Sequence, residues 1–181
     1  MPETTPERFL TAAGTYRGHP MAKATVEMAL WDLSARVLRT PLCRLLGGRD
    51  RPIPVGVSVG LEASPQALVD QVTAYRTAGY GRIKLKVTPR KDEAYVAQVR
   101  RTFPDIPLWI DANQAYALED LSRLARWAAR YRVQLIEQPF PEDRLVWHAR
   151  LARRLRQPTR LCLDESVTGP GRLEEALALR A

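Results

Sequence analysis

The sequence predicts an α/β protein, a partial TIM-like (β/α) barrel of about five strand–helix units that follow a helical segment. From Gly56 onward, short apolar stretches alternate with amphipathic helical stretches. Consecutive apolar stretches start about 25 residues apart, which suits one strand, one helix and two short loops. Such alternation is typical of a parallel sheet with right-handed crossovers. Periodicity alone leaves both a doubly wound sheet and a barrel open.

The first part of the chain, residues 1–50, lacks this repeat and is predicted to be a separate helical domain. The apolar spacing from Ala22 to Leu38 predicts one strong helix, and Leu42 to Leu46 would add a short turn. Prolines at the joint separate this segment from residues 51–181, which carry the repeat.

Five strands are expected in the repeat, and the best-marked helix follows the first of them. Ser64 is a typical N-cap, Pro65 suits the first helical position, and Gly79 suits the helix end. The expected strands are Val55–Val59, Arg82–Val87, Leu108–Asp111, Val133–Glu137 and Arg160–Asp164.

The bulk composition excludes several functional classes. The net charge of +8 could indicate nucleic-acid binding, but the arginines are spread along helical stretches without interleaved aromatic residues, which is typical of solvated helix faces. No apolar run reaches the roughly 18 residues of a membrane span, and the N-terminus lacks the pattern of a signal peptide. Two cysteines in unrelated contexts indicate neither zinc nor a disulfide framework. A cytoplasmic protein without nucleic-acid or membrane partners is expected.

Three predicted strands end in a carboxylate: Asp111, Glu137 and Asp164, at intervals of 26 and 27 residues. In a parallel barrel the C-terminal strand ends open on one face, so these acids should converge. Clustered negative charges need a cation to neutralise them. An all-oxygen ligand set favours Mg²⁺, with Mn²⁺ as an alternative. A lone acid at a strand end would instead read as a helix cap or a surface charge.

Two lysines precede these acids by one strand. Lys84 and Lys86 lie on the same face of their strand because side chains alternate. If that face is the barrel interior, desolvation and a nearby metal ion would lower a lysine pKa toward the range useful for a general base. A solvent-facing pair on an edge strand is the alternative.

In these motifs the chain resembles the enolase superfamily, and within it the muconate-lactonizing branch. The resemblance is strongest to the group of o-succinylbenzoate synthases and N-acylamino acid racemases, and it extends over nearly the whole chain. The superfamily pattern consists of Lys84-x-Lys86, Asp111-Ala-Asn113, Glu137-Gln-Pro139 and Asp164-Glu-Ser166. The motifs that carry the narrower resemblance are Ala29-Leu-Trp-Asp-Leu33, Leu45-Leu-Gly-Gly48, Val55-Gly-Val-Ser-Val-Gly60 and Cys162-Leu-Asp-Glu-Ser166.

This resemblance implies a reaction, in which a proton is removed beside the carboxylate of a small-molecule substrate and Mg²⁺ stabilises the enediolate. Lys86 would be the base and Lys84 would tune it. The implied activity is dehydration to o-succinylbenzoate in menaquinone biosynthesis. Racemisation of N-acylamino acids, or another epimerase or cycloisomerase reaction, is the alternative. Asp111, Glu137 and Asp164 would bind the metal, and weaker candidates for substrate or supporting contacts are Ser58, Asn113, Glu165 and Ser166.

The chain also departs from the family pattern. Family members have a full α+β capping domain, about eight barrel strands and a second lysine on the sixth strand, whereas no lysine follows Lys91 here. We therefore expect an N- and C-terminally truncated fragment that gives little turnover alone. It should form a homo-oligomer or need further sequence to complete the barrel. The alternative from another class is an inactive remnant or a non-catalytic assembly module.

Overall fold

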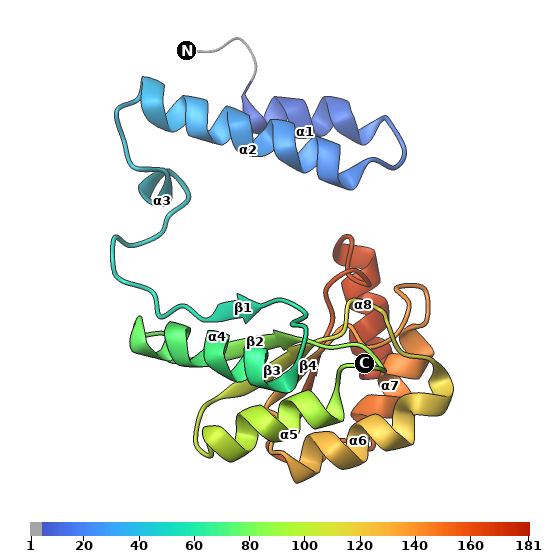
Figure 1. Cartoon of the computed structure of the whole chain (residues 1–181). Coiled ribbons are helices and arrows are strands. Elements are labelled where there is room, and N and C mark those ends of the chain that lie inside the picture. Colours follow the sequence, from blue (N-terminus) through green and yellow to red (C-terminus); the bar gives the residue numbers. More distant parts are fainter. Residues whose placement is uncertain (1–4) are drawn as a thin grey trace. The chain divides into compact units, whose positions relative to one another are not determined.

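The computed structural model describes residues 5–181 and divides into two compact units, Met1–Ile53 and Pro54–Ala181. The described part of the first unit is helical, with α1 (Pro6–Gly14), α2 (Pro20–Val37) and α3 (Leu42–Leu45). Figure 1 shows α1 and α2 lying side by side. Helix α1 was not expected, although Thr5 caps it through its hydroxyl and Pro6 occupies its first turn.

The second unit is the expected repeat of strands and helices. Its elements are β1 (Val57–Val59), α4 (Pro65–Thr77), β2 (Ile83–Lys86), α5 (Glu93–Thr102), β3 (Leu108–Asp111), the 3₁₀ turn η1 (Leu118–Asp120), α6 (Leu121–Arg130), β4 (Leu135–Glu137), α7 (Leu145–Ala152), β5 (Arg160–Cys162) and α8 (Pro170–Leu179). Ser64 caps α4 by accepting a hydrogen bond from the Ala67 N–H, as its sequence predicts.

The five strands form one parallel sheet in the order β1-β2-β3-β4-β5. Every strand pairs with its neighbour in sequence, whereas a doubly wound sheet requires a reversal of strand order. This topology confirms the α/β class and favours the barrel reading. Strand β5 is shorter than predicted. It ends at Cys162, two residues before Asp164.

The core lies between the sheet and its helices, with α4, α5 and α6 against one side of the sheet in Figure 1. Ile83 and Leu85 of β2 are fully buried in it. Because side chains alternate along a strand, Lys84 and Lys86 are turned to the opposite face of the sheet. The pair is not on an edge strand, since β2 is an inner strand. Lys84 is half-buried, whereas Lys86 at the end of β2 is exposed.

The strand register aligns one row of polar residues at the C-terminal end of the sheet. Lys86 pairs with Asp111, Asp111 with Glu137, and Glu137 with Cys162. The row crosses four strands, so its side chains leave neighbouring positions of the same sheet edge. This edge is where a parallel barrel carries its chemistry.

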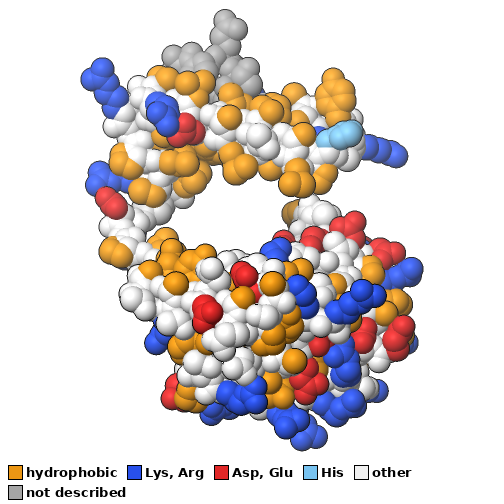
Figure 2. Space-filling model, in the orientation of Figure 1, with side chains coloured by type: hydrophobic (Ala, Val, Ile, Leu, Met, Phe, Trp, Pro, Cys, Tyr) orange, Lys and Arg blue, Asp and Glu red, His pale blue; other side chains and the backbone are white. Residues whose placement is uncertain are grey.

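The surface of the second unit carries scattered positive charge. In the face shown in Figure 2, basic side chains are interspersed with acidic ones over the helical layer. Within residues 5–181, no helix is both long enough and apolar enough to cross a membrane.

Candidate active site

Two of the predicted metal ligands converge on a lysine. The Lys84 ammonium donates hydrogen bonds to Glu137 Oε1 at 2.8 Å and Oε2 at 3.0 Å, and lies 3.3 Å from Asp111 Oδ2. Asp111 is 4% exposed and Glu137 is 9% exposed. Two buried carboxylates on adjacent strands thus share one cation, which offsets part of the cost of burying them together.

The pKa of Lys84 shifts in the opposite direction to the sequence-based expectation. Burial lowers its pKa, but the hydrogen bond to Glu137 and the attraction of Glu137 and Asp111 outweigh burial and raise the pKa above the usual lysine value. The expected lowering assumed a nearby metal ion, and without that ion the two carboxylates raise the pKa of Lys84 instead. The reason is that two carboxylates lie against the ammonium and stabilise its charge.

Lys86 belongs to a second hydrogen-bond network on the same edge of the sheet. Its ammonium donates to Asn113 Oδ1 at 2.7 Å, and Asn113 Nδ2 donates to Glu165 Oε1 at 3.4 Å. The Asn113 backbone N–H also donates to Asp111 Oδ1 at 3.2 Å. The other oxygen of Glu165, Oε2, is buried, and within residues 5–181 it has no hydrogen-bond partner. This network runs from β2 to the loop after β5. In it, the neutral amide of Asn113 connects the Lys86 ammonium to the Glu165 carboxylate.

The third predicted ligand is held differently. Asp164 follows the end of β5 and its side chain is exposed. Its backbone N–H donates to the side-chain oxygen of Gln138 at 2.9 Å. The main chain of Asp164 is therefore fixed, whereas its carboxylate is not drawn into the buried pair of Asp111 and Glu137.

The two predicted serines have different surroundings. Ser166 is 1% exposed, and its hydroxyl accepts a hydrogen bond from Gln138 Nε2 at 2.7 Å and donates to the Glu142 carbonyl at 3.0 Å. It supports the loop from within. Ser58 lies exposed on β1, opposite Lys84 in the register, where a ligand over the sheet edge could reach it.

The donor chemistry of this edge fits a hard divalent cation in part. Asp111 and Glu137 offer carboxylate oxygens beside each other, and these already hold a cation in the form of Lys84. However, among the described residues no three His, Cys, Asp or Glu side chains group closely enough to hold a metal ion. The register gives the reason, because Glu137 pairs with Cys162 and Asp164 lies two residues beyond it. The three-carboxylate site stays a prediction.

Gln138 lies inside the Glu137-Gln-Pro139 motif but was not predicted to be a site residue, and neither was His148, yet both are fully buried. The imidazole of His148 lies near Gln138, with Nδ1 next to the Arg144 carbonyl at 3.1 Å and Nε2 accepting from the Phe140 N–H at 3.3 Å. Burial lowers the pKa of His148. The hydrogen bonds to these backbone groups raise the pKa, but by less than burial lowers it. In the sequence, the burial of His148 is indicated only by its position among the apolar residues of α7.

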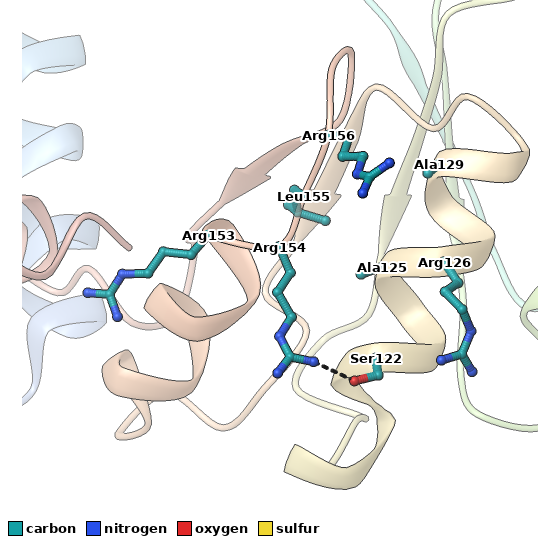
Figure 3. A pocket seen from close by; sticks show the side chains of 8 residues that line it. All are labelled: Ser122, Ala125, Arg126, Ala129, Arg153, Arg154, Leu155 and Arg156. Atoms are coloured by element: carbon teal, nitrogen blue, oxygen red, sulfur yellow. Dashed lines mark hydrogen bonds between the residues drawn. The ribbon is translucent and has the colours of Figure 1, made fainter.

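A surface groove elsewhere on the second unit is lined by arginines rather than by the candidate residues. Figure 3 shows it between α6 and the segment after α7, where Arg154 donates to Ser122 Oγ at 2.7 Å. The residues lining this groove include none of the predicted site residues. The groove therefore does not alter the location of the candidate site.

Comparison with known proteins identifies related sequences along both units. Residues 67–181 match the family described as enolase C-terminal domain-like, and residues 4–47 match the mandelate racemase / muconate lactonizing enzyme N-terminal domain. An o-succinylbenzoate synthase from Geobacillus kaustophilus is 43% identical over 178 residues, which is 98% of this chain and 46% of that protein. An N-succinylamino acid racemase from Thermus thermophilus is 43% identical over 97% of this chain and 47% of its own length.

Solved structures give the same relationship. A member of the enolase superfamily from Listeria innocua superposes with a TM-score of 0.87 at 37% identity, covering 99% of this chain and 47% of that one. The chain spans about half the length of the curated relatives it matches. With the family domain matched over residues 67–181, the sheet-edge motifs and this structural likeness, the chain belongs to the enolase superfamily, in its mandelate racemase / muconate lactonizing group.

Proposed function

We propose that the C-terminal edge of the sheet is part of a Mg²⁺-dependent site that removes a proton next to a substrate carboxylate. The observation that carries this proposal is the convergence of Asp111 and Glu137 on Lys84, with Lys86 two residues further along the same strand face. Buried acids and cations gathered at the carboxyl edge of a parallel sheet are typical of catalytic sites.

Each residue has a role in this proposal. Asp111, Glu137 and Asp164 would hold the metal, which when bound supplies positive charge that stabilises developing negative charge on a substrate carboxylate. Lys86 would take the α-proton as the neutral amine, and its hydrogen bond to Asn113 holds the side-chain nitrogen at a defined position. Lys84 offsets part of the negative charge of the buried carboxylate pair.

The proposed reaction is dehydration of a β-hydroxy carboxylate to o-succinylbenzoate. In it, the α-proton passes to Lys86, which then returns a proton to the β-hydroxyl so that this group departs as water. Relatives named o-succinylbenzoate synthase support this choice. Racemisation of an N-succinylamino acid is the second candidate, because a relative with that name is equally similar, at 43% identity. Both reactions begin with the same proton removal.

The metal site is tested by titrating the chain with Mn²⁺ and following the electron paramagnetic resonance signal of the free ion. We expect Asp111→Asn and Asp164→Asn each to weaken binding by more than the roughly 10-fold effect of a residue that only supports a ligand. Asp143→Asn, an exposed acid of the same unit, is the matched control and should bind like the wild type. Equal binding by wild type and Asp164→Asn would show that the three-ligand assignment is wrong.

The role of Lys86 is tested separately by proton exchange in D₂O. Exchange of an α-proton requires one base only, so it isolates Lys86 from the rest of the reaction. With Mg²⁺ and an N-succinylamino acid, we expect loss of the α-proton signal in proton NMR, slowed by about 100-fold or more in Lys86→Met. Lys91→Met, whose ammonium binds the Glu62 carbonyl in another loop, is the control. Equal exchange by Lys86→Met and wild type contradicts the proposed base.

A further inference from the structure

Gln138 is a fully buried polar side chain whose amide is satisfied on both sides. Its oxygen accepts hydrogen bonds from the backbone N–H groups of Asp164 at 2.9 Å and Ser166 at 3.2 Å. Its nitrogen donates to the Phe140 carbonyl at 3.1 Å and to Ser166 Oγ at 2.7 Å. With N–H groups facing the oxygen, and a carbonyl and a hydroxyl facing the nitrogen, its partners define the amide orientation.

The backbone of Gln138 also departs from the strand that carries it. It follows Glu137, the last residue of β4, and has a φ of 36°, which is uncommon for a residue other than glycine. Such a conformation persists where the surroundings determine it strongly. Here the Gln138 N–H donates to the Cys162 carbonyl at 3.0 Å, and its own carbonyl accepts from the Gln114 N–H at 2.8 Å. Gln138 is thus held from β5 and from the loop after β3.

A second buried group closes the environment around this amide. His148 Nε2 lies 3.4 Å from Gln138 Nε2, and burial lowers the pKa of the imidazole, which favours its neutral form. A neutral ring whose Nδ1 carries the proton for the Arg144 carbonyl presents an acceptor at Nε2. The nitrogen side of the Gln138 amide therefore faces acceptors only, which disfavours rotation of the amide by half a turn.

This arrangement lies where the backbone ladder between β4 and β5 stops. The last register pair is Glu137 with Cys162, so no strand pairing fixes the chain at Asp164. The Gln138 side chain takes over that task, because it binds the two N–H groups that flank Glu165. One residue thereby connects the end of β4 to the loop that carries Asp164 and Glu165.

We propose that Gln138 is a positioning residue that sets the loop of Asp164 and Glu165 against Glu137. Its consequence for metal affinity rests on the proposed function, whereas its hold on the loop does not. The side chain would touch neither metal nor substrate. It acts by fixing the backbone from which the Asp164 carboxylate and the unpartnered Glu165 oxygen project.

The first test measures amide hydrogen exchange by NMR on the full chain. In Gln138→Leu, the Asp164 and Ser166 N–H groups lose their acceptor and should exchange roughly 10-fold faster, measured relative to the amides of β3. Gln138→Glu keeps an oxygen facing both N–H groups and should show a smaller increase. Gln134→Leu, an exposed glutamine just before β4, is the control and should match the wild type.

The second test measures Mn²⁺ affinity of the same proteins. Gln138→Leu should bind Mn²⁺ roughly 10-fold more weakly, as expected when a residue that orients a ligand is lost, while Gln134→Leu binds normally. If Gln138→Leu does not fold, Ser166→Ala replaces it. That variant removes one partner of the amide, and we expect faster exchange at residue 164.

The two proposals fail in different ways. Unchanged relative exchange of the Asp164 and Ser166 amides in every folded Gln138 or Ser166 variant overturns the positioning role. Faster exchange with unchanged Mn²⁺ affinity, in a chain where Asp111→Asn abolishes binding, also overturns it. If wild type and Asp111→Asn bind Mn²⁺ equally, the proposed function fails, and the exchange rates alone then decide whether Gln138 holds the loop.

Discussion

The two kinds of predicted ligand in this site are fixed by different means. Asp111 and Glu137 are strand residues, paired in register and buried around the Lys84 ammonium. Asp164 lies beyond the end of its strand, with an exposed carboxylate and a main chain held by Gln138. A sheet ladder sets the first two directly, whereas the third depends on side chains from a neighbouring strand.

This difference teaches that regular spacing in sequence does not ensure equal placement in space. All three acids recur at nearly the same interval, yet only the two within the ladder converge. Strand residues are expected to keep their positions whether or not a metal is bound. The loop residue is expected to respond to its support and to a bound cation.

The largest expected effect comes from removing the cation that the strand acids share. Lys84→Met leaves Asp111 and Glu137 buried together without a counter-charge, and should lower the free energy of unfolding by about 3 kcal/mol at neutral pH. Millimolar Mg²⁺ should restore part of this loss, because a divalent cation can replace the ammonium. Urea denaturation with and without Mg²⁺ measures both effects.

The control for this variant is Lys91→Met, which removes a lysine from outside the acid pair. Its stability should not respond to Mg²⁺ more than that of the wild type. If Lys84→Met is as stable as the wild type, or if Mg²⁺ stabilises both equally, the two carboxylates do not depend on a shared cation.

A smaller effect is expected at a buried acid outside the site. Asp92 caps α5 and accepts hydrogen bonds from Arg123 at 2.7 Å and from the Tyr116 hydroxyl at 3.0 Å. Arg123→Met should cost about 2 kcal/mol of stability, since a charge-assisted hydrogen bond is lost while Tyr116 still partners the acid. Thermal unfolding measures this loss. The Mn²⁺ affinity of this variant should stay at the wild-type value. A lower affinity would mean that the hydrogen bonds of Asp92 and the candidate metal site are coupled.

The smallest effect is a change in pH dependence. Because the pKa of His148 is lowered in the folded chain, the unfolded chain binds the extra proton first as pH falls below about 6.5. The contribution of neutral His148 is therefore present above that pH and is progressively lost on acidification.

This pH effect is checked in His148→Gln, which does not titrate in that range. Its urea midpoint should fall less between roughly pH 7 and 5 than the wild-type midpoint does. Parallel slopes in the two proteins would contradict a neutral buried imidazole.

The order of the elements could be predicted from the sequence because it depends on local patterns. The strand Leu108–Asp111 and the helix that starts after Ser64 agree with the structure at those boundaries. Such patterns are carried by alternation, by cap residues and by proline, all of which act within a few residues. The family resemblance rested on motifs at the same strand ends.

The arrangement of the site could not be predicted to the same degree. Strand β5 ends at Cys162 because its neighbour Gln138 leaves the extended conformation, which no residue of β5 reveals. The raised pKa of Lys84 depends on which acids it reaches. The burial of His148 depends on the packing of α7 under the sheet edge. Each of these follows from contacts between segments that lie far apart in sequence.

The pairing of Glu137 with Cys162 has a practical consequence. The chain has two cysteines, and the other, Cys43, is an exposed free thiol in the first unit. Cys43→Ser therefore leaves one native thiol, in the row of residues at the sheet edge. A small fluorine-bearing thiol reagent on Cys162 would give a single resonance beside Glu137, and its chemical shift could follow cation binding without any new residue being placed in the site.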